Sequence, residues 1–341
     1  MADYQIGEIM PCTVIAGGFW GDEGKGKILS YLALKDKLDF CVRTGSVNAA
    51  HTIWHEGKRY ALHMVPGGFV YPKCRLLLAP GSNVHVAQFN KEVEETQVHS
   101  RVAIDGQASI IEEKHSNQDK TSAHLKGLGT TGWGVGPAIE ERTRRTAKLA
   151  RDIPELRSYL TDVPTEINQA LDQNKQVLLE GTQGLLLSLY HGTYPYVTAR
   201  DTSASAICSE AGVGPTRVNH VIVVLKSFIT RVGTGPLPGE MTREEATKRG
   251  WFEKAAGTGR DRRSAPFNME LAKKATVINS ATQIALTKLD CLYPESKGTR
   301  TCEELSKEAK QFIKDVEKQT QTPVTLVGTG PDALDMIDRR K

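Results

Sequence analysis

The sequence predicts an α/β fold: one large domain with a mainly parallel central sheet and helices on both of its faces. Short runs rich in Val, Ile and Leu alternate with stretches of helical periodicity along almost the whole chain. The runs are apolar at successive positions, which is typical of parallel strands buried on both faces. No internal repeat and no Pro- or Ser-rich linker divides the chain. We therefore expect residues 1–341 to form a single domain.

The predicted elements follow from these patterns in chain order. The strands are the apolar runs at 12–18, 40–45, 59–65, 75–81, 176–181, 220–228, 283–290 and 324–330. The helices are the periodic stretches at 27–37, 85–96, 138–153, 165–173 and 302–319. Two stretches of weak periodicity, 106–137 and 184–206, are rich in Gly and Thr. We expect both to be active-site loops rather than linkers.

Composition excludes several classes of protein. Hydrophobic residues make up 39% and charged residues 25%, an ordinary globular balance that excludes a disordered or fibrous chain. No apolar run reaches the roughly 18 residues of a membrane span, and the N-terminus lacks the basic start of a secretory signal. The six cysteines form no CxxC pair, which favours reduced thiols. With a net charge of only +4, we expect a cytoplasmic protein without membrane or nucleic-acid partners.

A glycine-rich turn follows the first predicted strand and opens a helix. Gly21-Asp22-Glu23-Gly24-Lys25-Gly26-Lys27 fits the spacing GxxxxGK, but Ile28 stands where a P-loop carries Ser or Thr. Glycines let backbone N–H groups converge on a phosphate, and the helix N-terminus adds positive potential. Because the hydroxyl that would hold Mg²⁺ is missing, Asp22 is the candidate metal ligand or general base. We predict a modified P-loop-like phosphate loop rather than a plain strand-to-helix turn.

The same turn, GGFWGDEGKGK, resembles the signature of adenylosuccinate synthetases, and further segments of that family follow in its order. They are NAAHT at 48–52, GTTG at 129–132, GPA at 136–138, EGTQG at 180–184, GTYPYVT at 192–198, TRVG at 230–233, TGRDRR at 258–263 and TKLD at 287–290. The resemblance covers nearly the whole chain, which has the length of compact archaeal-type members. It implies a ligase that joins L-aspartate to C6 of a 6-oxopurine nucleotide, using a nucleoside triphosphate to phosphorylate O6 first.

The resemblance assigns roles around the phosphate loop. Asp22 matches the family's base for the N1 proton, and His51 matches its acid on the transferring phosphoryl group. A lone His in an apolar stretch is more often structural, but the NAAHT context favours catalysis. Lys25 is expected to neutralise phosphate oxygens, and Asp22 with the backbone carbonyl of Ala50 is expected to hold the cofactor Mg²⁺. The purine monophosphate is expected to contact Asn48, Thr131, Arg145, Gln183, Thr198 and Val232.

Two charged segments complete the predicted site. Guanidinium forks suit a dicarboxylate, and Thr258, Arg260 and Arg262 match the family's L-aspartate loop. TKLD ends a predicted strand, where the stem of Lys288 would cover a guanine base and Asp290 would accept hydrogen bonds from it. These assignments imply GTP as the phosphoryl donor, with ATP or dATP left open.

The basic segment 142–151 carries the implied partner contact. Arg145 matches a family arginine that crosses a homodimer interface to the 5′-phosphate of the partner's nucleotide. Its neighbours on the same predicted helix, Arg142, Lys148 and Arg151, are expected to form a solvated basic face.

Several departures from the family pattern lie close to the motifs. They are Ser46, Ala50, Trp133 and 265–268. Ala50 stands where glycine is usual, which restricts φ at the predicted Mg²⁺ position. Because Asp22, His51 and the other matched residues remain, we interpret the departures as a changed substrate. A bacteriophage branch of the family uses dGMP, and dGMP is the favoured prediction, with the host cytoplasm as location for a phage-encoded chain. The persistence of Asp22 counts against that branch. The alternative is ordinary synthesis from IMP, L-aspartate and GTP.

Two other classes of protein compete with the ligase. A nucleotide-dependent switch would also need a glycine-rich loop and TKLD, but it would leave TGRDRR and EGTQG unexplained. A nucleic-acid binder could use the Arg-rich helix, but the modest net charge and the lack of interleaved aromatic residues argue against it. Turnover that depends on L-aspartate separates the ligase from both.

Overall fold

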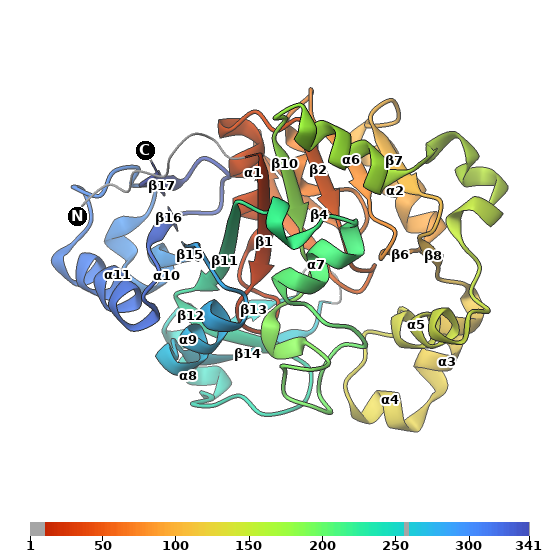
Figure 1. The fold of residues 1–341 in the computed structure, drawn as a ribbon. Coiled ribbons are helices and arrows are strands. Elements are labelled where there is room, and N and C mark those ends of the chain that lie inside the picture. Colours follow the sequence, from red (N-terminus) through yellow and green to blue (C-terminus); the bar gives the residue numbers. More distant parts are fainter. Residues whose placement is uncertain (1–10, 256–258, 341) are drawn as a thin grey trace.

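A ten-stranded sheet runs through the computed structural model, which describes residues 11–255 and 259–340. The strand order is β17-β16-β15-β11-β1-β10-β2-β5-β7-β9 (Figure 1). Every neighbouring pair is parallel except β16 with β17. The predicted class, a mainly parallel sheet within an α/β fold, is confirmed.

The strands of this sheet are short, and each central one is buried along nearly all of its length. Their bounds are β1 (Cys12–Gly17), β2 (Phe40–Arg43), β5 (Arg75–Leu78), β7 (Val102–Asp105), β9 (Leu160–Thr161), β10 (Val177–Glu180), β11 (His220–Lys226), β15 (Gln283–Thr287), β16 (Val324–Gly328) and β17 (Met336–Asp338). Three small sheets join β12 (Phe228–Val232) with β14 (Asp261–Pro266) and β13 (Glu253–Lys254), β3 (His51–His55) with β4 (Lys58–Leu62), and β6 (Asn83–Val84) with β8 (Ser109–Ile110).

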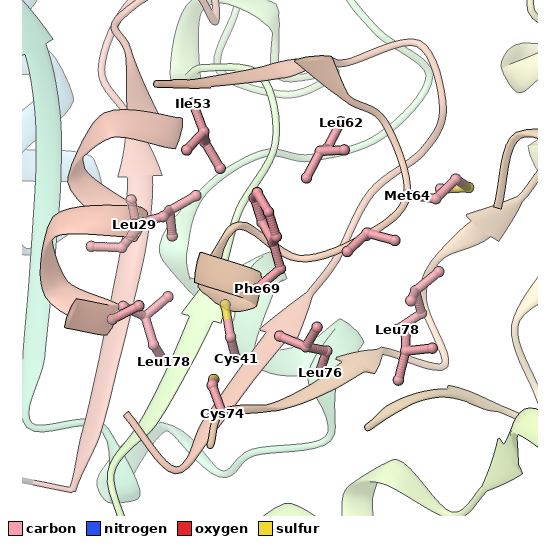
Figure 2. Close-up of a cluster of buried hydrophobic side chains, with 14 of the residues drawn as sticks. Leu29, Cys41, Ile53, Leu62, Met64, Phe69, Cys74, Leu76, Leu78 and Leu178 are labelled. Atoms are coloured by element: carbon pink, nitrogen blue, oxygen red, sulfur yellow. The ribbon is translucent and has the colours of Figure 1, made fainter. Parts of the chain in front are cut away.

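Helices cover both faces of the sheet. The helices of the described residues are α1 (Lys25–Lys35), α2 (Val86–Thr96), α3 (Glu113–Thr121), α4 (Ala123–Gly127), α5 (Val135–Arg144), α6 (Val163–Asp172), α7 (Ala204–Ala211), α8 (Arg243–Lys248), α9 (Met269–Ile278), α10 (Leu289–Leu292) and α11 (Lys307–Thr320). Alternate residues of β1 show the two faces, since Ile15 packs in the cluster with α1 and Val14 in the cluster with α6 and α7. Figure 2 shows part of the first cluster, where Leu29 of α1 and Phe69 lie over strand residues such as Cys41 and Leu178.

Several predicted elements end earlier or lie elsewhere than expected. The run 59–65 forms β4 of a hairpin with β3 and takes no part in the central sheet. The predicted helix 138–153 ends at Arg144, because Arg145 adopts a left-handed conformation with φ 68°. The strand at 283–290 ends at Thr287 for the same reason, since Lys288 has φ 61°. The stretch 106–137, predicted as a loop, holds β8, α3 and α4. No helix in the described ranges is long and apolar enough to cross a membrane.

The carboxyl ends of five adjacent strands gather the predicted motifs. In sheet order, TKLD follows β15, TRVG lies beyond β11, the glycine-rich loop follows β1, EGTQG follows β10 and NAAHT follows β2. Parallel strands end at the same edge of a sheet, and this edge is where ligands bind in open α/β folds. The topology therefore brings motifs from distant parts of the sequence into one region.

Candidate active site

A cavity of about 390 Å³ opens at this edge of the sheet. Residues of the predicted site line it, and they come from seven of the motif segments: Gly21, Asp22, Asn48, Ala50, His51, Thr131, Gln183, Thr198, Val232, Arg260 and Arg262. Other predicted residues lie outside its lining: Glu23, Gly24, Lys25, Gly26, Lys27, Arg145, Lys288 and Asp290. Thr258 lies outside the described residues.

The glycine-rich loop is shaped from within by an ion pair. Glu23 Oε1 accepts hydrogen bonds from the backbone N–H groups of Phe19 at 2.9 Å and Gly21 at 2.8 Å, while Oε2 accepts from Lys25 Nζ at 2.9 Å. The side chains of Glu23 and Lys25 are buried. Gly21 and Gly24 have φ of 93° and 85°, a region that strains any residue with a Cβ. Lys25 thus supports the loop here, and its contact with phosphate stays a prediction.

Asp22 lies at the floor of the cavity with both oxygens engaged. Oδ1 is 3.0 Å from Arg262 Nη2, and Oδ2 accepts from the hydroxyl of Thr230 at 3.4 Å. Burial raises the pKa of Asp22 above its ordinary value, and the charges of Arg262 and Lys226 oppose that shift only in part. A raised pKa makes the carboxylate a stronger base, which suits proton abstraction.

His51 on β3 forms a buried triad with two side chains from the central sheet. Its Nδ1 lies 2.7 Å from Glu180 Oε1 and 3.0 Å from Arg43 Nη1, and Arg43 contacts Glu180 directly. Burial and the guanidinium of Arg43 lower the pKa of His51 to about 4, against the opposing effect of Glu180. The ring is therefore neutral near pH 7, and we assign the proton to Nδ1, donated to Glu180. Nε2 is buried and has no hydrogen-bond partner among the described residues, and His51 lines the cavity.

Glu180 and Arg43 were not among the predicted site residues. They are direct neighbours in the parallel pairing of β10 with β2. Burial alone would raise the pKa of Glu180, but Arg43 and the hydrogen bond from His51 outweigh burial and lower the pKa to about 2. A permanently ionised Glu180 fixes the orientation of His51. The pairing register that produces this contact is not visible in the spacing of the motifs.

Arg260 joins two of the predicted loops. Its Nη1 donates to the backbone carbonyls of Gly129 at 3.0 Å and Thr130 at 3.4 Å. The predicted L-aspartate segment is therefore tied to the GTTG segment, and both lie on the wall of the same cavity.

Lys27, Lys288 and Asp290 gather at a separate place beyond β15 and β16. Lys27 Nζ donates to the backbone carbonyl of Asp332, and burial lowers the pKa of Lys27 to about 8. Asp290 Oδ1 is buried and has no hydrogen-bond partner among the described residues, and burial raises the pKa of this carboxyl. A buried acceptor without a donor suits a ligand that brings N–H groups, as a guanine base does. Lys27 was predicted in the phosphate loop, but its ammonium points to this second place.

Most departures from the family pattern have structural roles away from the cavity. Ser46 Oγ accepts from Asn83 Nδ2 at 2.8 Å, Ala265 is fully buried in the core, and Asn268 caps α9. Trp133 packs against the rings of His63 and His85. Of these positions, only Ala50 lines the cavity.

Ala50 itself is not strained. It is absent from the described residues with positive φ, so the expected restriction at this position does not arise. Ser46, Trp133 and 265–268 do not line the cavity, so any effect of these departures on the choice of substrate would have to act through other residues.

The fold places a cavity at the carboxyl edge of a mainly parallel sheet, and comparisons with known proteins assign the chain to a class of ligases that form a carbon–nitrogen bond. A family model described as adenylosuccinate synthetase matches residues 14–155 and 146–295. The chain is 51% identical to the adenylosuccinate synthetase of Archaeoglobus fulgidus over 334 residues. The aligned region covers 97% of this chain and 99% of the relative. The chain therefore belongs to the adenylosuccinate synthetase family.

Solved structures agree with this assignment. The fully ligated adenylosuccinate synthetase from Plasmodium falciparum has a TM-score of 0.89 at 27% identity, covering 96% of this chain and 99% of that one. A cyanophage S-2L succinoaminodeoxyadenylate synthetase bound to dGMP and dATP has a TM-score of 0.82 at 23% identity, covering 97% of this chain and 96% of that one. The phage likeness shows a shared fold only. The relatives thus favour the alternative substrate prediction, IMP, over dGMP.

Proposed function

We propose that this protein joins L-aspartate to C6 of IMP with GTP as phosphoryl donor, in the synthesis of adenylosuccinate. The observation that carries the proposal is the 51% identity to an archaeal adenylosuccinate synthetase across nearly the full length of both chains. The placement of the departures supports it, because a changed base pocket should carry its changes on the cavity wall, and only Ala50 lies there.

The first chemical step is transfer of the γ-phosphoryl group to O6. Asp22 takes the N1 proton, O6 bonds to phosphorus, and the bond to the β-phosphate oxygen breaks to leave GDP. His51 presents Nε2 to the phosphoryl oxygens, held in place by Glu180 through Nδ1. To act as an acid, Nε2 must first acquire a proton, which the charge of the bound phosphates favours against the low intrinsic pKa.

The second step forms the carbon–nitrogen bond. The amine of L-aspartate attacks C6, the C6–O6 bond breaks, and inorganic phosphate leaves. Arg260 and Arg262 hold the two carboxylates of L-aspartate by paired N–H donation. Arg262 binds Asp22 in the structure, so exchange of that partner for a substrate carboxylate also releases Asp22.

Adenylosuccinate synthetases generally depend on Mg²⁺, and the donor set here fits that ion. Asp22 and the Ala50 carbonyl would hold it, because hard oxygen donors are what Mg²⁺ prefers and both residues line the cavity. The bound ion would neutralise charge on the phosphate oxygens. The protein is further proposed to act as a homodimer, in which the exposed Arg145 at the end of α5 reaches the partner's monophosphate.

The test is a substrate matrix. IMP, GMP, dIMP and dGMP are each assayed with L-aspartate, Mg²⁺ and either GTP or ATP, and the products are identified by mass spectrometry. We expect kcat/KM for IMP to exceed that for dGMP about tenfold or more, because a 2-amino group left unpaired costs roughly 1–3 kcal/mol. A higher kcat/KM for dGMP would overturn the proposal. GTP hydrolysis unaffected by L-aspartate would instead indicate a switch.

A further inference from the structure

One carboxylate, Glu253, contacts three cationic side chains behind the cavity. Its Oε2 accepts from Lys226 Nζ at 2.8 Å and from Arg262 Nη1 at 2.6 Å, and its Oε1 lies 3.2 Å from Lys288 Nζ. The side chain of Glu253 is 16% exposed and that of Lys226 only 2%. The proposed chemistry gives no role to Glu253, and Glu253 does not line the cavity.

The four members of the cluster come from four different segments, of which three are strands and the fourth, with Lys288, follows β15 at the start of α10. Glu253 on β13 lies directly opposite Arg262 on β14 in the antiparallel pairing. Lys226 ends β11, and its neighbour in the adjacent strand β15 is Thr287, the residue before Lys288. Glu253 therefore stands where the small three-stranded sheet meets the carboxyl edge of the central sheet. It is the group that links the two sheets at this point.

Charge balance requires Glu253 to stay ionised. Burial alone would raise its pKa, but Lys226, Lys288 and Arg262 outweigh burial and hold the pKa well below the ordinary range. Without the carboxylate, three cations would face one another, one of them almost fully buried. The like charges would then repel, and Arg262 and Lys288 would move into solvent or toward other anions.

Each oxygen of Glu253 serves a different part of the site. Through Oε2 it holds one end of the Arg262 fork, while the other end reaches Asp22 at 3.0 Å. Arg262 is thereby aimed into the cavity at the L-aspartate position. Through Oε1 it holds Lys288, two residues before the unpartnered Oδ1 of Asp290. The two contacts lie on predicted subsites for two different substrates.

We infer that Glu253 is a positioning residue that couples the L-aspartate subsite to the nucleoside triphosphate subsite, an inference that rests on the proposed function. It orients Arg262 for a substrate carboxylate and Lys288 for the base of the triphosphate. Because the same carboxylate serves both, its loss weakens both substrates together and leaves IMP, which Arg262 and Lys288 are not predicted to bind, unaffected.

The test is Glu253→Gln, with KM measured for each of the three substrates while the other two are saturating. We expect KM for L-aspartate and for GTP each to rise about tenfold, as loss of one charge-assisted hydrogen bond predicts. KM for IMP should change less than about twofold and kcat should fall less than either KM rises. Equal rises in all three KM values would overturn the inference, and so would unchanged KM values for L-aspartate and GTP.

Two further variants separate positioning from stability. Glu166→Gln also breaks a partly buried Arg–carboxylate pair, with Arg75 Nε at 2.9 Å, but neither residue lines the cavity, and the variant should leave all three KM values unchanged. Lys226→Met combined with Glu253→Gln removes the buried charge along with its partner, so the fold keeps no unpaired ammonium. The double variant should show the same two KM rises. Unchanged KM values for L-aspartate and GTP in this folded double variant would contradict the inference.

The route to the triphosphate is tested with Lys288→Met. In that background Glu253→Gln should no longer raise KM for GTP, because the contact through Oε1 is already absent, but it should still raise KM for L-aspartate. Additive effects on KM for GTP would overturn the link through Lys288. A wild-type chain without any aspartate-dependent turnover would refute the proposed function itself and this inference with it.

Discussion

Asp22 and His51 face the same cavity, but they are tuned in opposite directions. Burial raises the pKa of Asp22 and lowers that of His51, so burial disfavours the charged form of each side chain. At both sites a neighbouring charge opposes the effect of burial. For Asp22 the nearby Arg262 supplies that charge, and for His51 the ionised Glu180 does.

Asp22→Asn and His51→Asn should each lower kcat by roughly 10²–10⁴-fold, the range for a positioned acid or base. At position 22, asparagine keeps the size of the aspartate. At position 51, asparagine can still donate a hydrogen bond to Glu180 in place of the imidazole. The measurement is the initial rate of adenylosuccinate formation, with thermal unfolding as a check on folding. His55→Asn, on the same strand as His51, is the matched control and should keep wild-type activity. Near-full activity in either cavity variant would remove the assigned role.

The low pKa of Glu180 should make the free energy of unfolding depend on pH in the acid range. Its pKa is about 2 in the folded chain against an ordinary 4.5, so the folded state binds fewer protons than the unfolded state between these values. The stabilisation is present above pH 4.5 and is lost as pH falls toward 2, at up to about 1.4 kcal/mol per pH unit. The free energy of unfolding, from urea titrations at pH 5, 4 and 3, should fall more steeply for wild type than for Glu180→Gln. Parallel curves would contradict the assignment.

The sequence predicted which motif residues line the cavity, but it did not predict the residues that hold those side chains in place. Asp22 and Gln183 line the cavity as expected because each follows a predicted strand. Glu180 needs Arg43, which is 137 positions away, and the contact exists only through the register of two strands. Glu253 likewise meets Lys226 and Lys288 only when the small sheet that holds β13 packs against the ends of β11 and β15. Sequence spacing carries no information on such long-range register.

At the scale of elements, the glycine-rich loop is fitted against the EGTQG loop. A Cβ on Gly21 would lie 3.0 Å from Gln183 Cα, and the φ of 93° would strain it as well. Gly57, in the turn between β3 and β4, has φ 74° but no atom within 4 Å of such a Cβ. A side chain at Gly57 would therefore meet backbone strain alone, whereas a side chain at Gly21 would meet both backbone strain and a steric conflict.

Gly57→Ala should cost about 1–2 kcal/mol of stability, the strain of a left-handed residue alone, and leave activity unchanged. Gly21→Ala should cost more and also lower activity, because backbone must move where Asp22 and Gln183 meet the cavity. Urea unfolding and initial rates measure the two effects. Equal stability losses with wild-type activity in both variants would show that the two loops do not depend on close packing.

Helix and strand boundaries failed where single residues take left-handed conformations. The periodicity of 138–153 continues through Arg145, yet Arg145 ends the helix with its backbone N–H bonded to the carbonyls of Arg142 and Glu141. The same holds for Lys288 after β15. Neither residue is a glycine, so composition offered no signal. Helices α3 and α4 were missed because they are short and polar, with few buried residues to mark a periodic face.

On the scale of the whole molecule, the site depends on strand order more than on any one motif. Five adjacent strands of the sheet carry their motifs to one edge, although the strands are not consecutive in the chain. The basic segment 142–151 does not lie on one helix, because α5 ends at Arg144. Arg145 lies at the end of α5, where it is exposed and does not line the cavity.

This position makes the shared-site prediction specific. If Arg145 serves the partner's monophosphate, Arg145→Leu and Asp22→Asn each inactivate a homodimer, but in a hybrid both substitutions fall in the same active site and leave the other site intact. Random exchange in an equal mixture makes half of the dimers hybrids with one intact site each, so about a quarter of wild-type activity should return. Arg144→Leu is the matched control, since Arg144 is exposed and pairs with Glu140 on its own helix at 2.7 Å, and the variant should stay active alone. Mass spectrometry of differently tagged copies monitors exchange. Hybrid dimers without recovered activity would show that each subunit completes its own site.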